Sequence, residues 1–85
     1  MTDLKADFET AVTASRQVAA MPDNATLLEL YALFKQATVG DVTGERPEGF
    51  DLVGAAKFDA WEDRRGLSKD DAMRAYIAVV TRLKT

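Results

Sequence analysis

Residues 24–38, NATLLELYALFKQAT, decide the class of fold, because their apolar side chains recur at intervals of three and four. That spacing places them on one face of an α-helix, which takes 3.6 residues per turn. The stripe consists of Leu27, Leu30, Phe34 and Ala37. Asp23 or Asn24 can accept hydrogen bonds from the first free N–H groups, and we expect the helix to end near Thr38. The stretch therefore predicts an amphipathic helix that must pack against further elements.

Three more segments show helical periodicity. One covers about residues 3–20 and stops before Pro22, and another runs from residue 51 or 52 to 64. The last follows Ser68, which can act as an N-cap with Asp71 at the third helical position of a capping box. Its apolar stripe consists of Met73, Tyr76, Ile77, Val80 and Leu83. Four helical patterns predict an all-α protein.

The connections between these helices predict their order in space. Short connections follow the first and the third helix, so each of these helices should lie antiparallel to its successor. Residues 39–50, VGDVTGERPEGF, form a long loop rich in Gly and charge, which lets the third helix run parallel to the second. The sequence therefore predicts a four-helix up-down-down-up bundle, with residues 1–85 as a single domain.

The composition argues against several classes of function. The chain has no Cys and no His, which removes disulfides, thiolate zinc sites and the commonest general base. No nucleophile pairs with a base, so we expect a binding protein with no catalytic residue, no metal and no cofactor. A net charge of −3 with mixed signs argues against nucleic-acid binding. Without a signal peptide or a run of about 18 apolar residues, we expect a cytoplasmic monomer with no membrane insertion.

Three residues of the second helix lie together beside its apolar stripe. Leu28, Tyr31 and Lys35 are spaced so that a phenol and an ammonium lie one turn apart, next to apolar surface. Such a pair can bind a phosphate beside an apolar groove. It also fits a tyrosine at the core boundary with a lysine extended over the core. Three residues elsewhere can likewise have either a binding role or a structural one. Taken singly, Tyr76 fits a core tyrosine, and Lys57 and Arg16 fit solvated charges.

A series of short motifs follows in one order along the chain. The longest is residues 31–41, YALFKQATVGD. After it come Glu45-Arg46-Pro47, Asp51, Gly54, Ala56-Lys57 and Ala60-Trp61. The last group is Gly66, Ser68-Lys69, Asp70-Asp71-Ala72-Met73 and Ala75-Tyr76-Ile77. Taken together, these motifs and their spacing resemble the acyl-CoA-binding protein family, and the resemblance extends from Phe8 over nearly the whole chain.

The resemblance implies an up-down-down-up bundle that binds medium- to long-chain fatty acyl-CoA esters as an intracellular carrier and pool former. By that similarity the ligand-binding residues are Arg16, Tyr31, Ala32, Leu33, Phe34, Lys35, Lys57 and Tyr76. Among them Tyr31, Lys35 and Lys57 would bind the 3′-phosphate and adenine end. The acyl chain would lie over Phe8, Val12, Leu27 and Leu28. It should dominate the affinity, because each buried CH₂ contributes about 0.8 kcal/mol.

Four positions depart from the family pattern. Phe34 keeps an aromatic ring but lacks the hydroxyl that a Tyr commonly supplies there. Lysine is common in the family at three positions that are apolar here, namely Met21, Val53 and Ala55. These differences predict a less positive pocket, which affects affinity more than the class of ligand.

Two other functions are open at this point. A helical interaction module would take a partner helix in its groove, and its melting temperature would not respond to acyl-CoA. A small enzyme acting on the same ligand, such as a thioesterase, would release a thiol over time.

Overall fold

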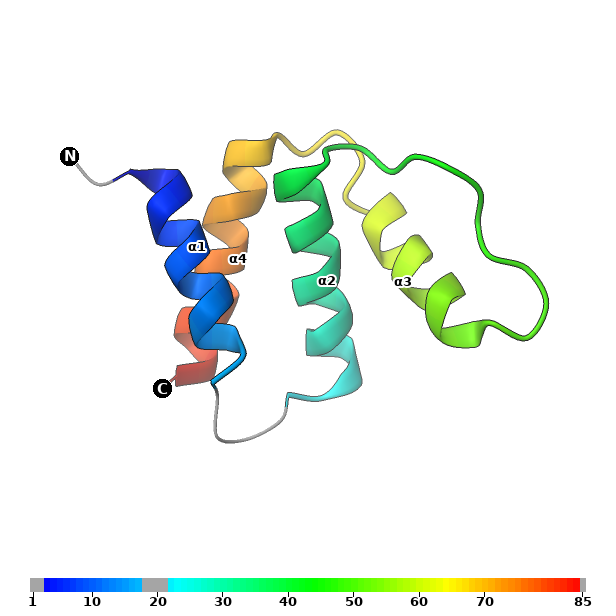
Figure 1. Ribbon diagram of the computed structural model, residues 1–85, viewed down its shortest axis with the longest axis horizontal. Helices are drawn as coiled ribbons and strands as arrows, with labels where there is room; N and C mark the ends of the chain where they lie inside the picture. Colours follow the sequence, from blue (N-terminus) through cyan, green and yellow to red (C-terminus); the bar gives the residue numbers. More distant parts are fainter. Residues whose placement is uncertain (1–2, 18–21, 85) are drawn as a thin grey trace.

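The computed structural model describes residues 3–17 and 22–84, which form α-helices and, within those ranges, no strand (Figure 1). The helices are α1 (Leu4–Ser15), α2 (Asn24–Thr38), α3 (Leu52–Glu62) and α4 (Lys69–Lys84). The all-α prediction is confirmed.

Side-chain caps fix where the four described helices begin. The Asp3 carboxylate accepts a hydrogen bond from the Lys5 N–H at the start of α1 (3.0 Å). The Asp23 carboxylate accepts a hydrogen bond from the Thr26 N–H (2.8 Å), and the Asp51 carboxylate accepts one from the Gly54 N–H (2.9 Å). The Ser68 hydroxyl accepts one from the Asp71 N–H (3.0 Å), as expected of an N-cap. The capping box is only half formed, because the Asp71 carboxylate accepts from the Arg74 guanidinium instead (2.8 Å).

Two helices are shorter than their periodicity predicted. The first ends at Ser15 rather than near residue 20, and residues 18–21 lie outside the described part of the chain. The third ends at Glu62 rather than at Arg64. There the chain tightens into successive turns, in which the Arg64 N–H donates to the Trp61 carbonyl (2.9 Å). These turns lead to Gly66, whose φ of 92° favours glycine.

The direction of the helices confirms the up-down-down-up bundle. In Figure 1, α1 and α4 run one way, whereas α2 and α3 run the other. Helix α4 packs against both α1 and α2, and α3 packs against α2. The parallel course of α2 and α3 is made by the long loop, which passes along the outer side of α3 (Figure 1).

The core lies where α1, α2 and α4 meet. The Phe8 ring of α1 stacks on the Phe34 ring of α2, with centroids 6.0 Å apart, and meets the Tyr76 ring of α4 edge to face at 5.2 Å. Aliphatic side chains surround these rings, including Leu30, Leu33, Val79 and Val80, all buried. Helix α3 adds Ala55 and Trp61 as its buried residues.

A polar cluster joins the end of α2 to the turn between α3 and α4; we call it the Asp41 clamp. The Gln36 amide, 1% exposed, donates to the Asp41 carboxylate (2.9 Å) and to the Leu67 carbonyl (2.7 Å). The same Asp41 oxygen accepts from the Gly66 N–H (2.8 Å). Nearby, the Trp61 indole N–H donates to the Gly40 carbonyl (2.8 Å). These bonds fix the α3 C-terminus beside the α2 C-terminus, so the two helices stay parallel.

Candidate ligand-binding site

A crevice opens between α1, α2 and α4 at the height of the two tyrosines. Its volume is about 320 Å³, and its lining is Val12, Ser15, Arg16, Pro22, Leu27, Leu30, Tyr31, Phe34 and Tyr76. Four of the predicted ligand-binding residues therefore meet here, from three helices: Arg16, Tyr31, Phe34 and Tyr76. The Arg16 guanidinium is the cation at its edge, since Arg16 is the C-cap residue of α1 and is exposed.

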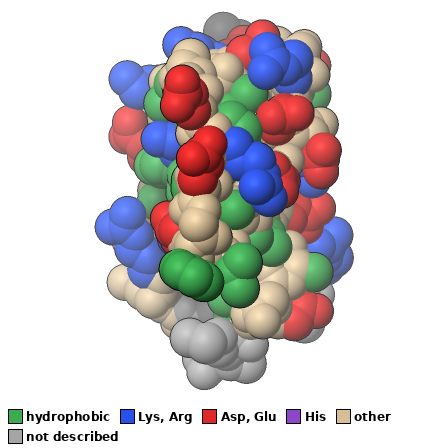
Figure 2. All heavy atoms as spheres, turned by 90° about the vertical axis from the view of Figure 1, so that its right-hand side faces the viewer, with side chains coloured by type: hydrophobic (Ala, Val, Ile, Leu, Met, Phe, Trp, Pro, Cys, Tyr) green, Lys and Arg blue, Asp and Glu red, His purple; other side chains and the backbone are tan. Residues whose placement is uncertain are grey.

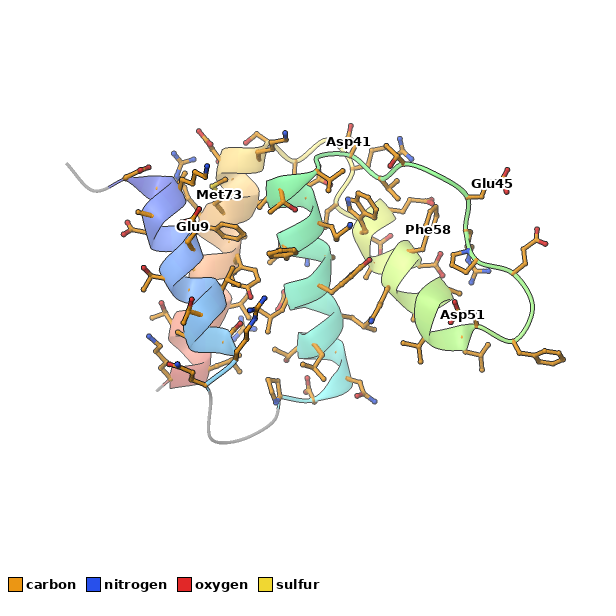
Figure 3. All side chains as sticks on the ribbon, in the orientation of Figure 1. Glu9, Asp41, Glu45, Asp51, Phe58 and Met73 are labelled. Carbon is orange, nitrogen blue, oxygen red and sulfur yellow. The ribbon has the colours of Figure 1, made fainter. Side chains whose placement is uncertain are left out.

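The crevice continues along the α1–α2 boundary into a second hollow of about 530 Å³. Val12 and Phe34 line both hollows, so they form one surface. The rest of the second lining is Lys5, Phe8, Glu9, Ala37, Thr38 and Met73. Figure 3 labels Glu9 on α1 and Met73 on α4 at this end. Because Phe8, Phe34 and Tyr76 meet at the floor, the combined crevice suits a flat aromatic group.

A hydrogen-bonded chain crosses the floor of the crevice. The Ser15 Oγ lies 2.7 Å from the Val12 carbonyl and 2.9 Å from the Tyr76 hydroxyl. A serine hydroxyl has one proton, and the carbonyl can only accept, so Ser15 donates to Val12. Tyr76 therefore donates to Ser15, and its oxygen keeps lone pairs that can accept from a ligand.

An apolar groove of about 350 Å³ lies on the other side of Leu27, between the first turns of α2 and α3. Its lining is Asn24, Leu27, Leu28, Leu52, Val53, Ala56 and Lys57. Leu27 lines both this groove and the crevice, so the two are adjacent. Figure 2 shows hydrophobic side chains gathered low on this face of the molecule, where α3 begins.

Two lysines lie on the boundary between α2 and α3 in a reciprocal arrangement. The Lys57 Nζ of α3 lies 5.3 Å from the ring centroid of Tyr31 on α2, and the Lys35 Nζ of α2 lies 4.9 Å from the Trp61 ring on α3. Each helix thus contributes an aromatic ring and a lysine four residues apart. Since α2 and α3 are parallel, the two lysines are anchored about one helical turn, or ~6 Å, apart along the boundary.

Among the residues that the structure describes, neither ammonium is paired with a carboxylate. Within residues 3–17 and 22–84, no Asp or Glu oxygen lies within 4.0 Å of the Lys35 or Lys57 Nζ. Arg46 contrasts with them, because the Asp59 carboxylate accepts two hydrogen bonds from its guanidinium (2.9 and 3.1 Å). That pairing lowers the pKa of the Asp59 carboxyl and raises the pKa of Arg46. Lys35 and Lys57 are therefore available to an anionic ligand, whereas Arg46 is engaged.

The remaining predicted residues are two further ligand-binding residues and four acyl-chain contacts, and they lie in different parts of the structure. Ala32 and Leu33 are each 1% exposed, so their side chains are buried, and their place among the ligand-binding residues stays a prediction. The four predicted acyl contacts fall into two places: Phe8 and Val12 line the aromatic crevice, and Leu28 lines the apolar groove. Leu27 borders both.

The positions that depart from the family pattern lie in different surroundings. Val53 lines the groove, whereas Ala55 is buried on the side of α3 that faces the core. Met21 lies outside the described residues. Of the two positions that the structure describes, Val53 alone lines the groove.

Sequence reasoning missed two contributors to the site, Ser15 and Leu52, and it named Val53 only as a departure from the family pattern. Ser15 meets Tyr76 across 61 positions of sequence, which no local pattern signals. Leu52 and Val53 carried a weak signal, because two adjacent apolar residues at a helix start are both exposed, at 76% and 66%.

The chain matches the model of the family described as Acyl CoA binding protein over residues 5–80. Acyl-CoA-binding protein homolog 1 of Caenorhabditis elegans is 50% identical over 76 residues, which cover 89% of this chain and 88% of that protein. The acyl-CoA-binding protein homolog of Manduca sexta is 51% identical over 81 residues, covering 94% and 90%.

Solved structures agree with these relatives. The crystal structure of Oryza sativa Acyl-CoA-Binding Protein 2 superposes with a TM-score of 0.92 at 40% identity, covering 96% of this chain and 91% of that one. The crystal structure of ACBP from Moniliophthora perniciosa gives a TM-score of 0.83 at 35% identity, covering 100% and 86%. By sequence and by fold, the chain belongs to the acyl-CoA-binding protein family.

Proposed function

We propose that this chain binds one fatty acyl-CoA ester and carries it as a pool-forming, non-enzymatic binding protein. Such a ligand has a polyanionic nucleotide head and a long apolar tail. The observation that carries the proposal is that an aromatic crevice with Arg16 at its edge adjoins an apolar groove through Leu27. The chain's membership in the family supports the same ligand class.

The head of the ligand belongs in the crevice. Its adenine ring would lie against the aromatic floor formed by Phe8, Phe34 and Tyr76, and the Tyr76 oxygen can accept from its amino group. Lys35 and Lys57 would bind the 3′-phosphate, because two ammonium groups that meet no carboxylate in the described part of the chain and are anchored one turn apart can both reach one phosphate. Arg16 would bind the phosphates at the open edge.

The tail of the ligand belongs in the groove between α2 and α3. Five of its seven lining residues are aliphatic, and the predicted contacts Leu27 and Leu28 form the α2 wall. Burial of the tail supplies most of the affinity at about 0.8 kcal/mol per CH₂, and the head supplies specificity. Phe8 and Val12 then contact the head rather than the tail.

We further propose that the carrier is a cytoplasmic monomer and that it accepts medium- to long-chain esters. None of the helices described between residues 3 and 84 is long and apolar enough to cross a membrane. A net charge of −3 disfavours an anionic lipid or nucleic-acid surface as the resting place of the protein.

Calorimetry with palmitoyl-CoA, free coenzyme A and palmitate, measured side by side, tests the proposal. We expect one-to-one binding of palmitoyl-CoA, weak binding of coenzyme A and no appreciable binding of palmitate, because the cations serve the nucleotide. Equal affinity for palmitate would indicate a generic lipid groove. Thiol release over time would indicate a thioesterase. If none of the three ligands gives a binding heat, the chain is better explained as a helical interaction module.

A further inference from the structure

We infer that Trp61 is a positioning residue for the phosphate site: its indole ring holds the Lys35 ammonium in place without neutralising the charge. The inference rests on the proposed function, since that function assigns Lys35 to the 3′-phosphate. It gives a role to a residue that is part of neither the crevice lining nor the groove lining.

The Trp61 ring is fixed by burial and by a hydrogen bond. Its side chain is buried at the α2–α3 boundary, and its indole N–H donates to the Gly40 carbonyl (2.8 Å). An indole has a single donor, and this bond satisfies it. The plane of the ring is therefore set by the loop that follows α2, and not by packing alone.

The same loop residue also fixes the backbone of Lys35. The Gly40 N–H donates to the Lys35 carbonyl (3.2 Å), and Gly40 makes this turn with a φ of 101°, which favours glycine. Gly40 thus bonds the Lys35 backbone through its N–H and the Trp61 indole through its carbonyl. The lysine and the ring beneath its ammonium are held by one residue, so their relative position is fixed.

A ring positions an ammonium differently from a carboxylate. The Lys35 Nζ lies 4.9 Å from the Trp61 centroid, within the range at which a cation is attracted to an aromatic face. The attraction leaves the positive charge uncompensated and leaves N–H donors for a ligand. A lysine that is already held loses less side-chain freedom when it binds a phosphate. Lys35 is half-buried whereas Lys57 is exposed, so the Lys35 pair is the more constrained of the two.

A competing role for the ring would have the opposite sign. If the ammonium had to leave the ring in order to reach the phosphate, a weaker attraction to the ring would strengthen binding. If the ring positions the ammonium, a weaker attraction weakens binding. Fluorine substituents draw electron density from the face of an indole while they keep its N–H and nearly its shape, so they change this attraction selectively.

The test uses the fact that Trp61 is the only tryptophan of the chain. Protein is produced with ordinary, monofluorinated, difluorinated and trifluorinated tryptophan, in the wild-type sequence and in Lys35→Ala. Calorimetry measures the affinity of each protein for palmitoyl-CoA and for 3′-dephospho-palmitoyl-CoA. Melting temperatures establish that each protein is folded.

We expect the wild-type affinity for palmitoyl-CoA to fall with each fluorine, by about two- to ten-fold in total, as the lysine loses its preorganisation. The affinity for the dephospho ligand should not change, and the Lys35→Ala series should not respond with either ligand. An affinity for palmitoyl-CoA that stays constant or rises overturns the inference alone, as does an equal fall with both ligands. If the ordinary protein binds neither ligand, the proposed function is overturned as well.

Discussion

The hydroxyl of Tyr76 donates to Ser15, whose own proton bonds the Val12 carbonyl, so this tyrosine contributes to stability as well as to the crevice. We expect Tyr76→Phe to lower the free energy of unfolding by about 0.5–1.5 kcal/mol, as the loss of one hydrogen bond. Ser15→Ala should cost a similar amount, and the double variant less than the sum, because both remove one interaction. Chemical denaturation measures all three.

Tyr31→Phe is the control for this prediction, since it removes the hydroxyl of the other tyrosine. Its unfolding free energy should change little, because the Tyr31 ring, not its hydroxyl, makes the contact with Lys57. If Tyr76→Phe unfolds like wild type but binds palmitoyl-CoA more weakly, the hydroxyl serves the ligand rather than Ser15.

Lys35 and Lys57 are the residues on which the phosphate site depends. A charge-assisted hydrogen bond contributes about 1.5–3 kcal/mol, so Lys35→Ala or Lys57→Ala should weaken acyl-CoA binding roughly ten- to a hundred-fold. The double variant should lose less than the product, because both ammonium groups bind one phosphate. Calorimetry measures each loss, with Lys84→Ala as the control of equal charge change near the end of α4.

The decisive comparison uses 3′-dephospho-acyl-CoA. Against this ligand the two lysine variants should bind almost as well as wild type, because the group that they contact is missing. Equal losses with and without the 3′-phosphate would mean that the lysines act elsewhere on the ligand, and the phosphate would then be assigned to Arg16.

At the scale of the elements, the Asp41 clamp makes the parallel packing of α2 and α3 sensitive to acid (Figure 3). The Gly66 N–H and, to a smaller extent, the Gln36 amide bond the carboxylate and lower the pKa of Asp41 below its ordinary 3.8. Because the folded pKa is the lower one, the clamp stabilises the fold fully above the unfolded pKa. That stability is lost as the pH falls through the folded pKa, below 3.8.

We therefore expect Asp41→Asn to lower the melting temperature at neutral pH and to flatten its decline below pH 4. Thermal unfolding monitored by circular dichroism between about pH 7 and pH 2.5 measures both effects. Glu45→Gln removes the same charge from the same loop and should leave the acid limb unchanged. An acid limb equally steep in Asp41→Asn would show that other carboxylates produce it.

The periodicity of apolar residues predicted the four helices well, because a helix depends on the spacing of residues that are close in the sequence. The stripe of α2 and the cap at Ser68 are properties of neighbouring residues, and both were found as expected. The end of α1 was placed too late, because the apolar spacing continues beyond Ser15 although the helix does not. Likewise, Arg64 fits the pattern of α3 but lies in the turns that lead to Gly66.

The candidate site was predicted less completely than the fold. The motif around Tyr31 and Lys35 identified the α2 wall, and it also includes Ala32 and Leu33, whose side chains are buried. Which apolar residues face the head and which face the tail depends on the separation of the crevice from the groove. That separation arises only when helices from distant parts of the sequence meet, so Ser15 was not predicted and Val53 was named only as a departure from the family pattern.

At the scale of the whole molecule, a bound ligand should raise the free energy of unfolding. A ligand present at a hundred times its Kd adds about 2.7 kcal/mol to the free energy of unfolding. For a domain of this size we expect the melting temperature to rise by roughly 10–20 °C with palmitoyl-CoA. Differential scanning calorimetry measures the shift, with coenzyme A and palmitate as controls. An equal shift with palmitate would contradict the requirement for a nucleotide head.

Helix α3 contacts only α2 among the described helices, and it buries little besides Ala55 and Trp61. Its backbone amides should therefore exchange hydrogen for deuterium faster than those of α4, which lies between two helices. A bound tail would bridge α2 and α3 and slow that exchange. Detachment of α3 is then the local unfolding event that frees the tail. The residence time of the ligand, and hence the rate at which a carrier can deliver it, would be set by how often α3 opens rather than by the strength of the head contacts.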